Sequence, residues 1–110
     1  MSDEAFRELV RVLEEAIQAG ADSVGLEWED RDLVVYLCFG DTGLGSVSIP
    51  RDLQEPVLGE IVRGAGLERK SQGEIPATLL GVEYEVIVRE CDSFGESAFT
   101  LTLKKAKNGK

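Results

Sequence analysis

A chain of 110 residues suffices for one domain, and 43% hydrophobic residues can fill one core. The net charge of −9, from 21 acidic and 12 basic residues, argues against a nucleic-acid partner, because phosphate binding requires a concentrated positive surface. No apolar run approaches the roughly 18 residues that span a bilayer, and the acidic start MSDEAFRE differs from a secretory signal. We therefore predict a cytoplasmic protein without membrane insertion.

The first part of the sequence predicts a helix followed by two strands. Apolar residues recur at helical spacing over residues 3–19, and Gly20 then supplies a left-handed stop. The predicted core stripe of this helix is Phe6, Leu9, Val10, Leu13, Ala16 and Ile17. Ser23–Glu29 alternates as a half-buried strand does. Leu33–Phe39 is apolar on both faces, which predicts a central strand covered on both sides.

The middle of the chain predicts a turn, a short strand and a second helix. The glycine-rich segment Gly40–Ser46 is typical of a hairpin turn, since a phosphate-binding loop would need a lysine and a following helix. A short third strand is predicted at Val47–Ile49 and ends at Pro50. Asp52 followed by Glu55 is an N-capping pattern, so a second amphipathic helix should run to about residue 65.

The last third of the chain predicts three strands. Apolar residues alternate over 75–79, over 82–88 and over 99–103, with a tight turn at Leu80-Gly81. The element order is therefore α-β-β-β-α-β-β-β. We predict an α/β (α+β) fold of two layers, in which a mostly antiparallel sheet of about six strands carries two helices, mainly on one face.

A lysine-rich tail follows these elements. We place the single domain at residues 1–103 and a basic polar tail, KKAKNGK, at 104–110. Such a tail on an acidic domain is typically a solvated terminus, and contact with a polyanion or a membrane surface is the alternative.

The residue types argue against catalysis. Histidine is absent, which excludes histidine-dependent catalysis and every histidine metal site. Cys38 and Cys91 are predicted to be buried and reduced, and a bridge between them would require neighbouring strands. Acidic residues gather near neighbouring turns at a spacing that fits no calcium loop, so we expect a solvated rim. These residues are Glu27, Glu29, Asp30, Asp32 and Asp41. We predict a protein that is no enzyme and has no cofactor or metal.

Three aromatic residues are the candidate interaction residues. Trp28 and Tyr36 lie on adjacent predicted strands, and Phe94 lies in a later turn. If exposed, they would anchor a protein partner, because aromatic side chains dominate interface energetics. Packing in the core is the alternative for each of them.

The order of elements resembles a known domain. The runs LEEAIQAGADSVGLEWEDRDLVVYL, SQGEI and GVEYEVIVRECDSFGESAFTLTL resemble the N-terminal domain that precedes the motor in type II secretion and type IV pilus assembly ATPases. That family reads roughly A-S-D-I-H-I-E, V-R-x-R-x-D-G, P-Q-D-G-R-I and D-x-R-V-S…G-E. The features kept here are Ala19-Gly20-Ala21, Val24, Leu26, Glu27, Gly73, Ile75 and Gly95-Glu96. No GxxxxGK[ST] motor loop occurs in the sequence.

The resemblance implies a regulatory and coupling module whose arginines contact nucleotide phosphates. Aligned by eye, those arginines fall at Tyr36, Cys38, Glu74 and Val86, and the family's Asp and His fall at Ser23 and Gly25. We therefore expect a non-catalytic interaction module that docks to a related motor ATPase or to its own copies. The alternative is a small-ligand sensor with a pocket between the sheet and the helices.

Overall fold

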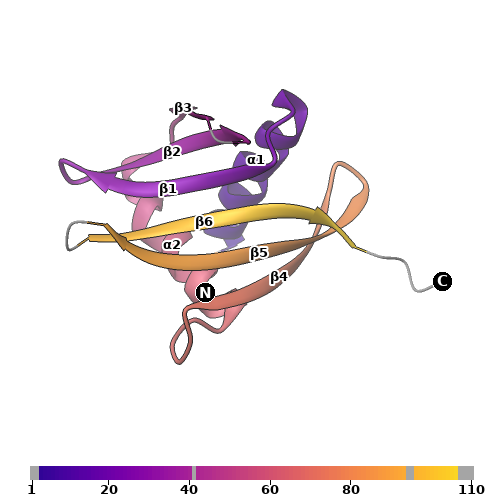
Figure 1. The fold of residues 1–110 in the computed structure, drawn as a ribbon. Helices are drawn as coiled ribbons and strands as arrows, with labels where there is room; N and C mark the ends of the chain where they lie inside the picture. Colours follow the sequence, from indigo (N-terminus) through magenta and orange to yellow (C-terminus); the bar gives the residue numbers. More distant parts are fainter. Residues whose placement is uncertain (1–2, 41, 94–95, 107–110) are drawn as a thin grey trace.

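The computed structural model describes residues 3–40, 42–93 and 96–106, and it has two layers. Helices α1 (Asp3–Ala19) and α2 (Arg51–Ala65) lie on one face of a six-stranded antiparallel sheet (Figure 1). The strands are β1 (Ser23–Glu29), β2 (Asp32–Phe39), β3 (Thr42–Val47), β4 (Gln72–Leu79), β5 (Val82–Ser93) and β6 (Glu96–Lys105). This arrangement confirms the predicted α+β class and element order. Strand β6 extends to Lys105, so the first two lysines of the predicted tail belong to the sheet.

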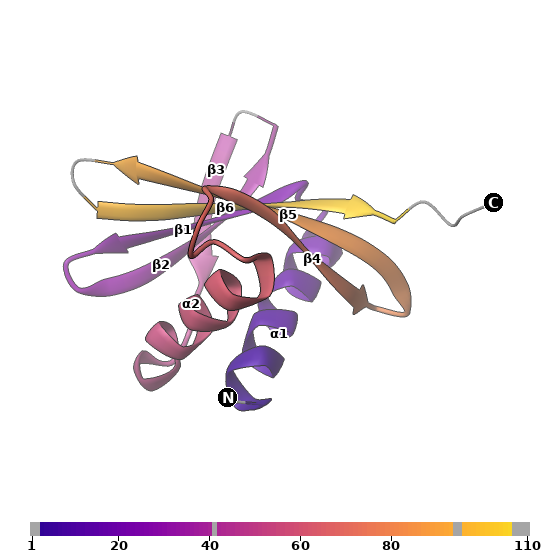
Figure 2. The ribbon, with the colours of Figure 1, turned by 90° about the horizontal axis from the view of Figure 1, so that it is seen from below.

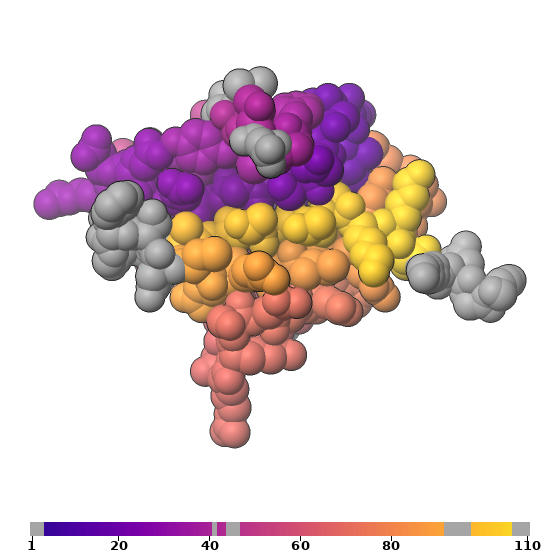
Figure 3. All heavy atoms as spheres, viewed as in Figure 1, coloured from indigo at the N-terminus to yellow at the C-terminus, as the bar shows by residue number. Residues whose placement is uncertain are grey.

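Two three-stranded meanders join at the centre of the sheet. The strand order is β3-β2-β1-β6-β5-β4, so β1 and β6 are central and β2 lies next to an edge. Figure 2 shows both helices on the same side of the sheet, and Figure 3 shows the face that carries no helix. The prediction that Leu33–Phe39 is covered on both sides is therefore wrong. Its outward residues, such as Val34, Tyr36 and Cys38, are half-buried among their strand neighbours.

The core lies between the helices and the sheet. It contains Leu26 and Leu101 from the central strands and Ile61 from α2, all at most 1% exposed. In α1 the most buried row is Ala5, Leu9, Val12, Leu13 and Ala16. Phe6, predicted to lie in this core stripe, is instead 43% exposed. The core-facing side of α1 is therefore rotated relative to the predicted one: Ala5 and Val12 are buried, and Phe6 lies at the edge of the buried face.

The glycine-rich segment is a strand, contrary to the sequence prediction. Thr42–Val47 forms β3, which pairs with β2, and Gly43 lies opposite Cys38. The chain reverses after Gly40, whose φ is 63°. The predicted short strand at Val47–Ile49 is wrong, because Ser48 and Ile49 connect β3 to α2. Glycines weaken a strand pattern but do not prevent pairing at a sheet edge.

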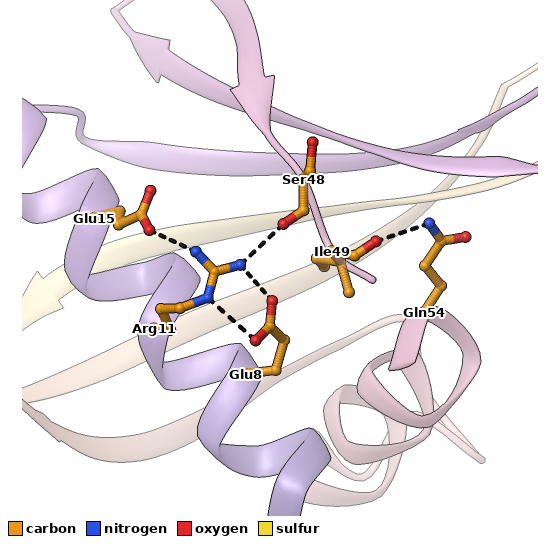
Figure 4. Close-up of polar contacts among 6 residues, drawn as sticks. All are labelled: Glu8, Arg11, Glu15, Ser48, Ile49 and Gln54. Atoms are coloured by element: carbon orange, nitrogen blue, oxygen red, sulfur yellow. Dashed lines mark hydrogen bonds and ion pairs between the residues drawn. The ribbon is translucent and has the colours of Figure 1, made fainter. Parts of the chain in front are cut away.

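Two polar side chains hold this connection (Figure 4). Arg11 of α1 donates from Nη2 to the carbonyl oxygen of Ser48 (2.9 Å), while it also pairs with Glu8 and Glu15 on its own helix. Gln54 of α2 is 4% exposed and donates from Nε2 to the carbonyl oxygen of Ile49 (3.0 Å). Both backbone carbonyls thereby have a partner, which buried Ile49 requires because water cannot reach it.

Gln54 also replaces the capping that we predicted for α2. Its Oε1 accepts a bond from the backbone N–H of Leu33 (3.1 Å), and its Nε2 donates to Asp32 (2.8 Å). The helix begins after Pro50, and no side chain caps it. The predicted Asp52–Glu55 capping pattern is therefore wrong: a buried amide, rather than a cap, fixes this end of α2 against β2.

The other end of α2 lies against the start of β4. A Cβ placed on Gly73 would lie 2.0 Å from the carbonyl oxygen of Ala65 and 3.0 Å from its Cβ. Neighbouring Gly64 lies against the side chain of Ile75, where an added Cβ would be 3.3 Å from Cδ1. Any side chain at position 73 would push the helix and the strand apart.

We predict that alanine in place of Gly73 and alanine in place of Gly59 have opposite effects on stability. Gly73→Ala should lower stability by about 2–3 kcal/mol, because backbone atoms of α2 would have to move. Gly59→Ala, on the exposed face of α2 with nothing within 4 Å, should raise stability by about 0.5–1 kcal/mol. Urea unfolding followed by circular dichroism measures both. Equal effects of the two substitutions would contradict the packing described for Gly73.

Candidate functional site

α1 directs a second row of side chains toward the β4–β5 hairpin. Phe6, Val10 and Glu14 are spaced by four residues and so lie along one line of the helix surface. Phe6 is exposed and Val10 is half-buried against the core. Figure 2 shows the turn of the hairpin on the same side of the sheet as α1 and beside it. This row forms one wall of the candidate site.

The β4–β5 hairpin forms the opposite wall. Its two turn residues, Leu80 and Gly81, have φ of 52° and 78°, as the tight turns that suit β-hairpins require. The backbone N–H of Leu80 donates to Oε2 of Glu14 (2.9 Å), which ties the turn to α1. The left-handed conformation costs a leucine roughly 1–2 kcal/mol, and asparagine is the residue usually found there.

Between these walls lies a hollow of about 700 Å³. Its apolar lining consists of Phe6, Val10, Pro76, Ala77, Tyr84 and Ala106. Thr78, Glu83 and Glu85 also border the hollow, but the alternation of β4 and β5 directs their side chains to the face of the sheet that carries no helix. Tyr84 is buried and Phe6 is exposed, so the hollow is an open trough with an apolar floor. We call this feature the α1–hairpin cleft.

Exposed apolar side chains lie in the α1–hairpin cleft and at the hairpin turn next to it. Among the described side chains, the large hydrophobic ones that remain exposed are Phe6 (43%), Leu80 (45%) and Val82 (41%). Phe6 lines the cleft, whereas Leu80 and Val82 lie at the hairpin turn, outside the lining. Single exposed hydrophobic residues are ordinary, but several together mark a binding surface.

The predicted interaction residues do not form one surface. Trp28 is half-buried and packs against the core on the helix side of β1. Tyr36 lies on the helix-free face of β2, because its neighbours Val35 and Leu37 face the core. Phe94 lies outside the described residues. The sheet therefore separates Trp28 from Tyr36.

Tyr36 has one specific partner on its face. Its hydroxyl donates to a carboxylate oxygen of Glu29 at the end of β1. This hydrogen bond raises the pKa of the Tyr36 phenol, with further contributions from desolvation and from the negative charges of Glu29 and Glu27. A phenol held protonated beside carboxylates acts as a hydrogen-bond donor and gives no sign of a reactive group.

The other candidate residues also stay apart. Within the described part of the chain, no group of three or more His, Cys, Asp or Glu residues is placed to hold a metal ion; Asp41 of the acidic rim lies outside it. Cys38 and Cys91 are both free, and β1 and β6 separate their strands. The prediction of burial is wrong for Cys91, which is exposed.

Three of the four positions aligned with the family's phosphate-binding arginines lie on the helix-free face. These positions are Tyr36, Cys38 and Glu74, and the α1–hairpin cleft lies across the sheet from that face. Val86 is fully buried on the helix side, so no side chain at this position would reach a ligand there. The next residue, Ile87, lies opposite Glu74 in the pairing of β4 with β5 and shares its face.

The sequence matches no protein-family model and no curated protein. None of the described helices is long and apolar enough to cross a membrane.

Sequence reasoning missed the α1–hairpin cleft. Phe6 belongs to the apolar residues of α1, and only the packing shows which of them lie on the flank. Leu80 gave a usable signal, because an apolar residue before glycine in a two-residue hairpin turn departs from the usual Asn-Gly or Asp-Gly.

We predict that two substitutions at Leu80 will differ in stability. Leu80→Ala and Leu80→Asn both remove the exposed side chain, but only asparagine favours the left-handed backbone. Leu80→Asn should therefore be more stable than Leu80→Ala by about 1 kcal/mol, or roughly 4 °C in Tm for a domain of this size. Thermal unfolding measures the difference. Equal melting temperatures would show that the turn places no demand on residue 80.

Proposed function

We propose that this protein is a non-catalytic interaction module that binds another protein through the α1–hairpin cleft. The observation that carries the proposal is an open trough with an apolar floor, which exposed Phe6 lines and beside which Leu80 and Val82, the other large hydrophobic side chains exposed in the described part of the chain, lie at the hairpin turn. Burying such side chains in a complex yields about 25 cal/mol per Å² of apolar surface removed from water. Anchors of this kind carry most of the energy of a protein interface.

The proposed partner follows from the family resemblance. A pre-motor domain of secretion and pilus ATPases acts by docking, and the partner proposed here is a motor ATPase of that class or a second copy of this chain, in the cytoplasm. Direct contact with nucleotide phosphates is not part of the proposal. The positions of the family arginines hold tyrosine, cysteine, glutamate and valine, and Glu74 carries the wrong charge for a phosphate.

A small-ligand sensor is the second candidate function. Its support is the volume of the α1–hairpin cleft, about 700 Å³, which lies within the range of roughly 300–1,000 Å³ typical of ligand pockets. Such pockets bury most of their ligand, whereas Phe6 in the wall of the cleft is exposed. An open trough suits a segment of protein better than a metabolite.

The test compares three forms of the protein as affinity baits in native lysate. Wild type, Phe6→Ser and Tyr36→Ser are immobilised, and the retained proteins are quantified by mass spectrometry. We expect a protein that wild type and Tyr36→Ser retain equally and that Phe6→Ser retains about tenfold less, because Phe6 is an anchor of the cleft. Circular dichroism confirms that each bait is folded.

Other outcomes would contradict parts of this proposal. A partner lost with Tyr36→Ser and kept with Phe6→Ser would move the interface to the helix-free face. Identical retention by all three baits would show that neither the α1–hairpin cleft nor the surface around Tyr36 binds the partner. A rise in Tm on adding nucleotides or metabolites, absent in Phe6→Ser, would favour the sensor.

A further inference from the structure

We infer that the outer edge of β3 pairs with β3 of a second copy of this chain, as antiparallel strands that join two sheets into one. This edge lies at the opposite margin of the sheet from the β4–β5 hairpin (Figure 1). The inference therefore goes beyond the proposed function and does not depend on it. Its support is the direction of the backbone groups of β3, their fit to a second copy and the contrast with the other edge.

The register of the β2–β3 hairpin determines which backbone groups of β3 point away from the sheet. Phe39 pairs with Thr42, so two residues separate them. Residues that flank a two-residue turn exchange backbone hydrogen bonds, and bonded and non-bonded pairs then alternate along the two strands. Thr42 and Leu44 therefore bond to β2, whereas the N–H and C=O groups of Gly43 and Gly45 point outward.

The contact of Gln54 with β2 supports this alternation. The odd-numbered residues of β2 direct their backbone groups toward β3, and Leu33 lies beyond the last residue that β3 pairs with. The N–H of Leu33 donates to Oε1 of Gln54 (3.1 Å), which takes the place of a strand there. Within the described part of the chain, no comparable hydrogen bond reaches the outward groups of Gly43 or Gly45. These groups are available to a partner.

A second copy fits these groups in one register. When two β3 strands run antiparallel with Leu44 opposite Leu44, Gly43 of each copy faces Gly45 of the other. Each pair exchanges two N–H···O=C bonds, so the two pairs give four bonds related by a twofold axis. In a register shifted by two residues, only one glycine of each copy would face a glycine. The bulge between Gly45 and Val47 ends the flat part of β3, so the contact is short and the dimer weak.

The composition of β3 favours a second copy as the occupant. Two chains with a net charge of −9 repel each other, so a close contact between them requires an uncharged surface. Thr42–Val47 contains no charged residue and no proline, the residues that commonly protect the edge of a sheet. A partner strand must itself be extended and unpaired on one side, and every copy of this chain brings such a strand, already ordered by β2.

The edge of β4 lacks these properties. Leu79 pairs with Val82 across the two-residue turn, so the odd-numbered residues of β4 bond to β5 and the even-numbered ones point their backbone groups outward. Pro76 is one of the outward residues and has no N–H, so a strand added here would lose a bond in the middle of the pairing. Glu74, two residues away, adds a negative charge that a second acidic chain would meet.

The test measures self-association of the full chain by analytical ultracentrifugation, from about 10 μM to about 1 mM, a range suited to a small interface. We expect a monomer–dimer equilibrium in wild type. Gly43→Pro should raise the dissociation constant at least about tenfold, because proline removes an outward N–H from each copy and keeps the bonds to β2. Gly43→Ala keeps the N–H, and its Cβ would lie 3.9 Å from Sγ of Cys38, so it should dimerise as wild type does.

Two further variants and one residue-level measurement locate the contact. Thr78→Pro removes an outward N–H from the opposite edge and should leave the dimer unchanged, as should Phe6→Ser in the α1–hairpin cleft. Hydrogen exchange followed by NMR should show the amides of Gly43 and Gly45 exchanging at least about fivefold more slowly at the highest concentration than at the lowest. Thermal unfolding verifies that every variant is folded.

Several results would overturn this inference. A wild-type monomer at every concentration, with no added protection at Gly43 and Gly45, would do so. A dimer that Gly43→Pro leaves intact would also overturn it, and loss of that dimer in Phe6→Ser would place self-association in the cleft. A lysate partner lost with Gly43→Pro and kept with Gly43→Ala, while wild type stays monomeric, would assign the edge to a foreign strand. None of these results depends on whether Phe6→Ser loses its own lysate partner, so this inference and the proposed function fail separately.

Discussion

The close approach of α2 to β4 determines how the helical layer sits on the sheet. The carbonyl oxygen of Ala65 occupies the place where a side chain at position 73 would begin. This contact holds the end of α2 on the first half of β4, while Gln54 holds its start against β2. The turn of the β4–β5 hairpin lies beside α1, where Glu14 accepts the N–H of Leu80 (Figure 2). The α1–hairpin cleft therefore lies where one helix, rather than two, covers the sheet.

This constraint also explains a feature that the resemblance to secretion ATPases left open. In the alignment that the proposed resemblance implies, Gly73 takes the place of the glycine of the P-Q-D-G-R-I motif and Glu74 that of its arginine. The structure gives the glycine a purely steric role, because α2 would collide with any side chain there. A residue with such a role is required whether or not its neighbour contacts a phosphate. Packing alone therefore accounts for this glycine.

Sequence reasoning succeeded where one physical signal dominated and failed where packing decided. The limits of α1, β1 and the Leu80-Gly81 turn followed from periodicity and turn chemistry. One failure was Gly40–Ser46, where the glycines suggested a turn although most of the segment belongs to an edge strand. Another was Asp52–Glu55, where the sequence suggested a cap although the buried amide of Gln54 fixes the start of the helix. The cleft could not be predicted because it depends on how α1 packs against a hairpin whose turn lies 66 residues after Glu14, and no local pattern encodes that packing.

Leu80 links the fold to the proposed function. A stable hairpin turn would carry asparagine, and a stable surface would avoid a large exposed apolar side chain, yet this position departs from both rules. Natural sequences agree with their fold at most positions and depart from it mainly at functional sites. Glu14 accepts the N–H of the same residue, so the turn is held in place although its sequence is unfavourable. The structure thus holds an unfavourable residue in position beside an open apolar cleft. A binding surface requires this, because it keeps an apolar contact available for a partner at a cost to the stability of the free protein.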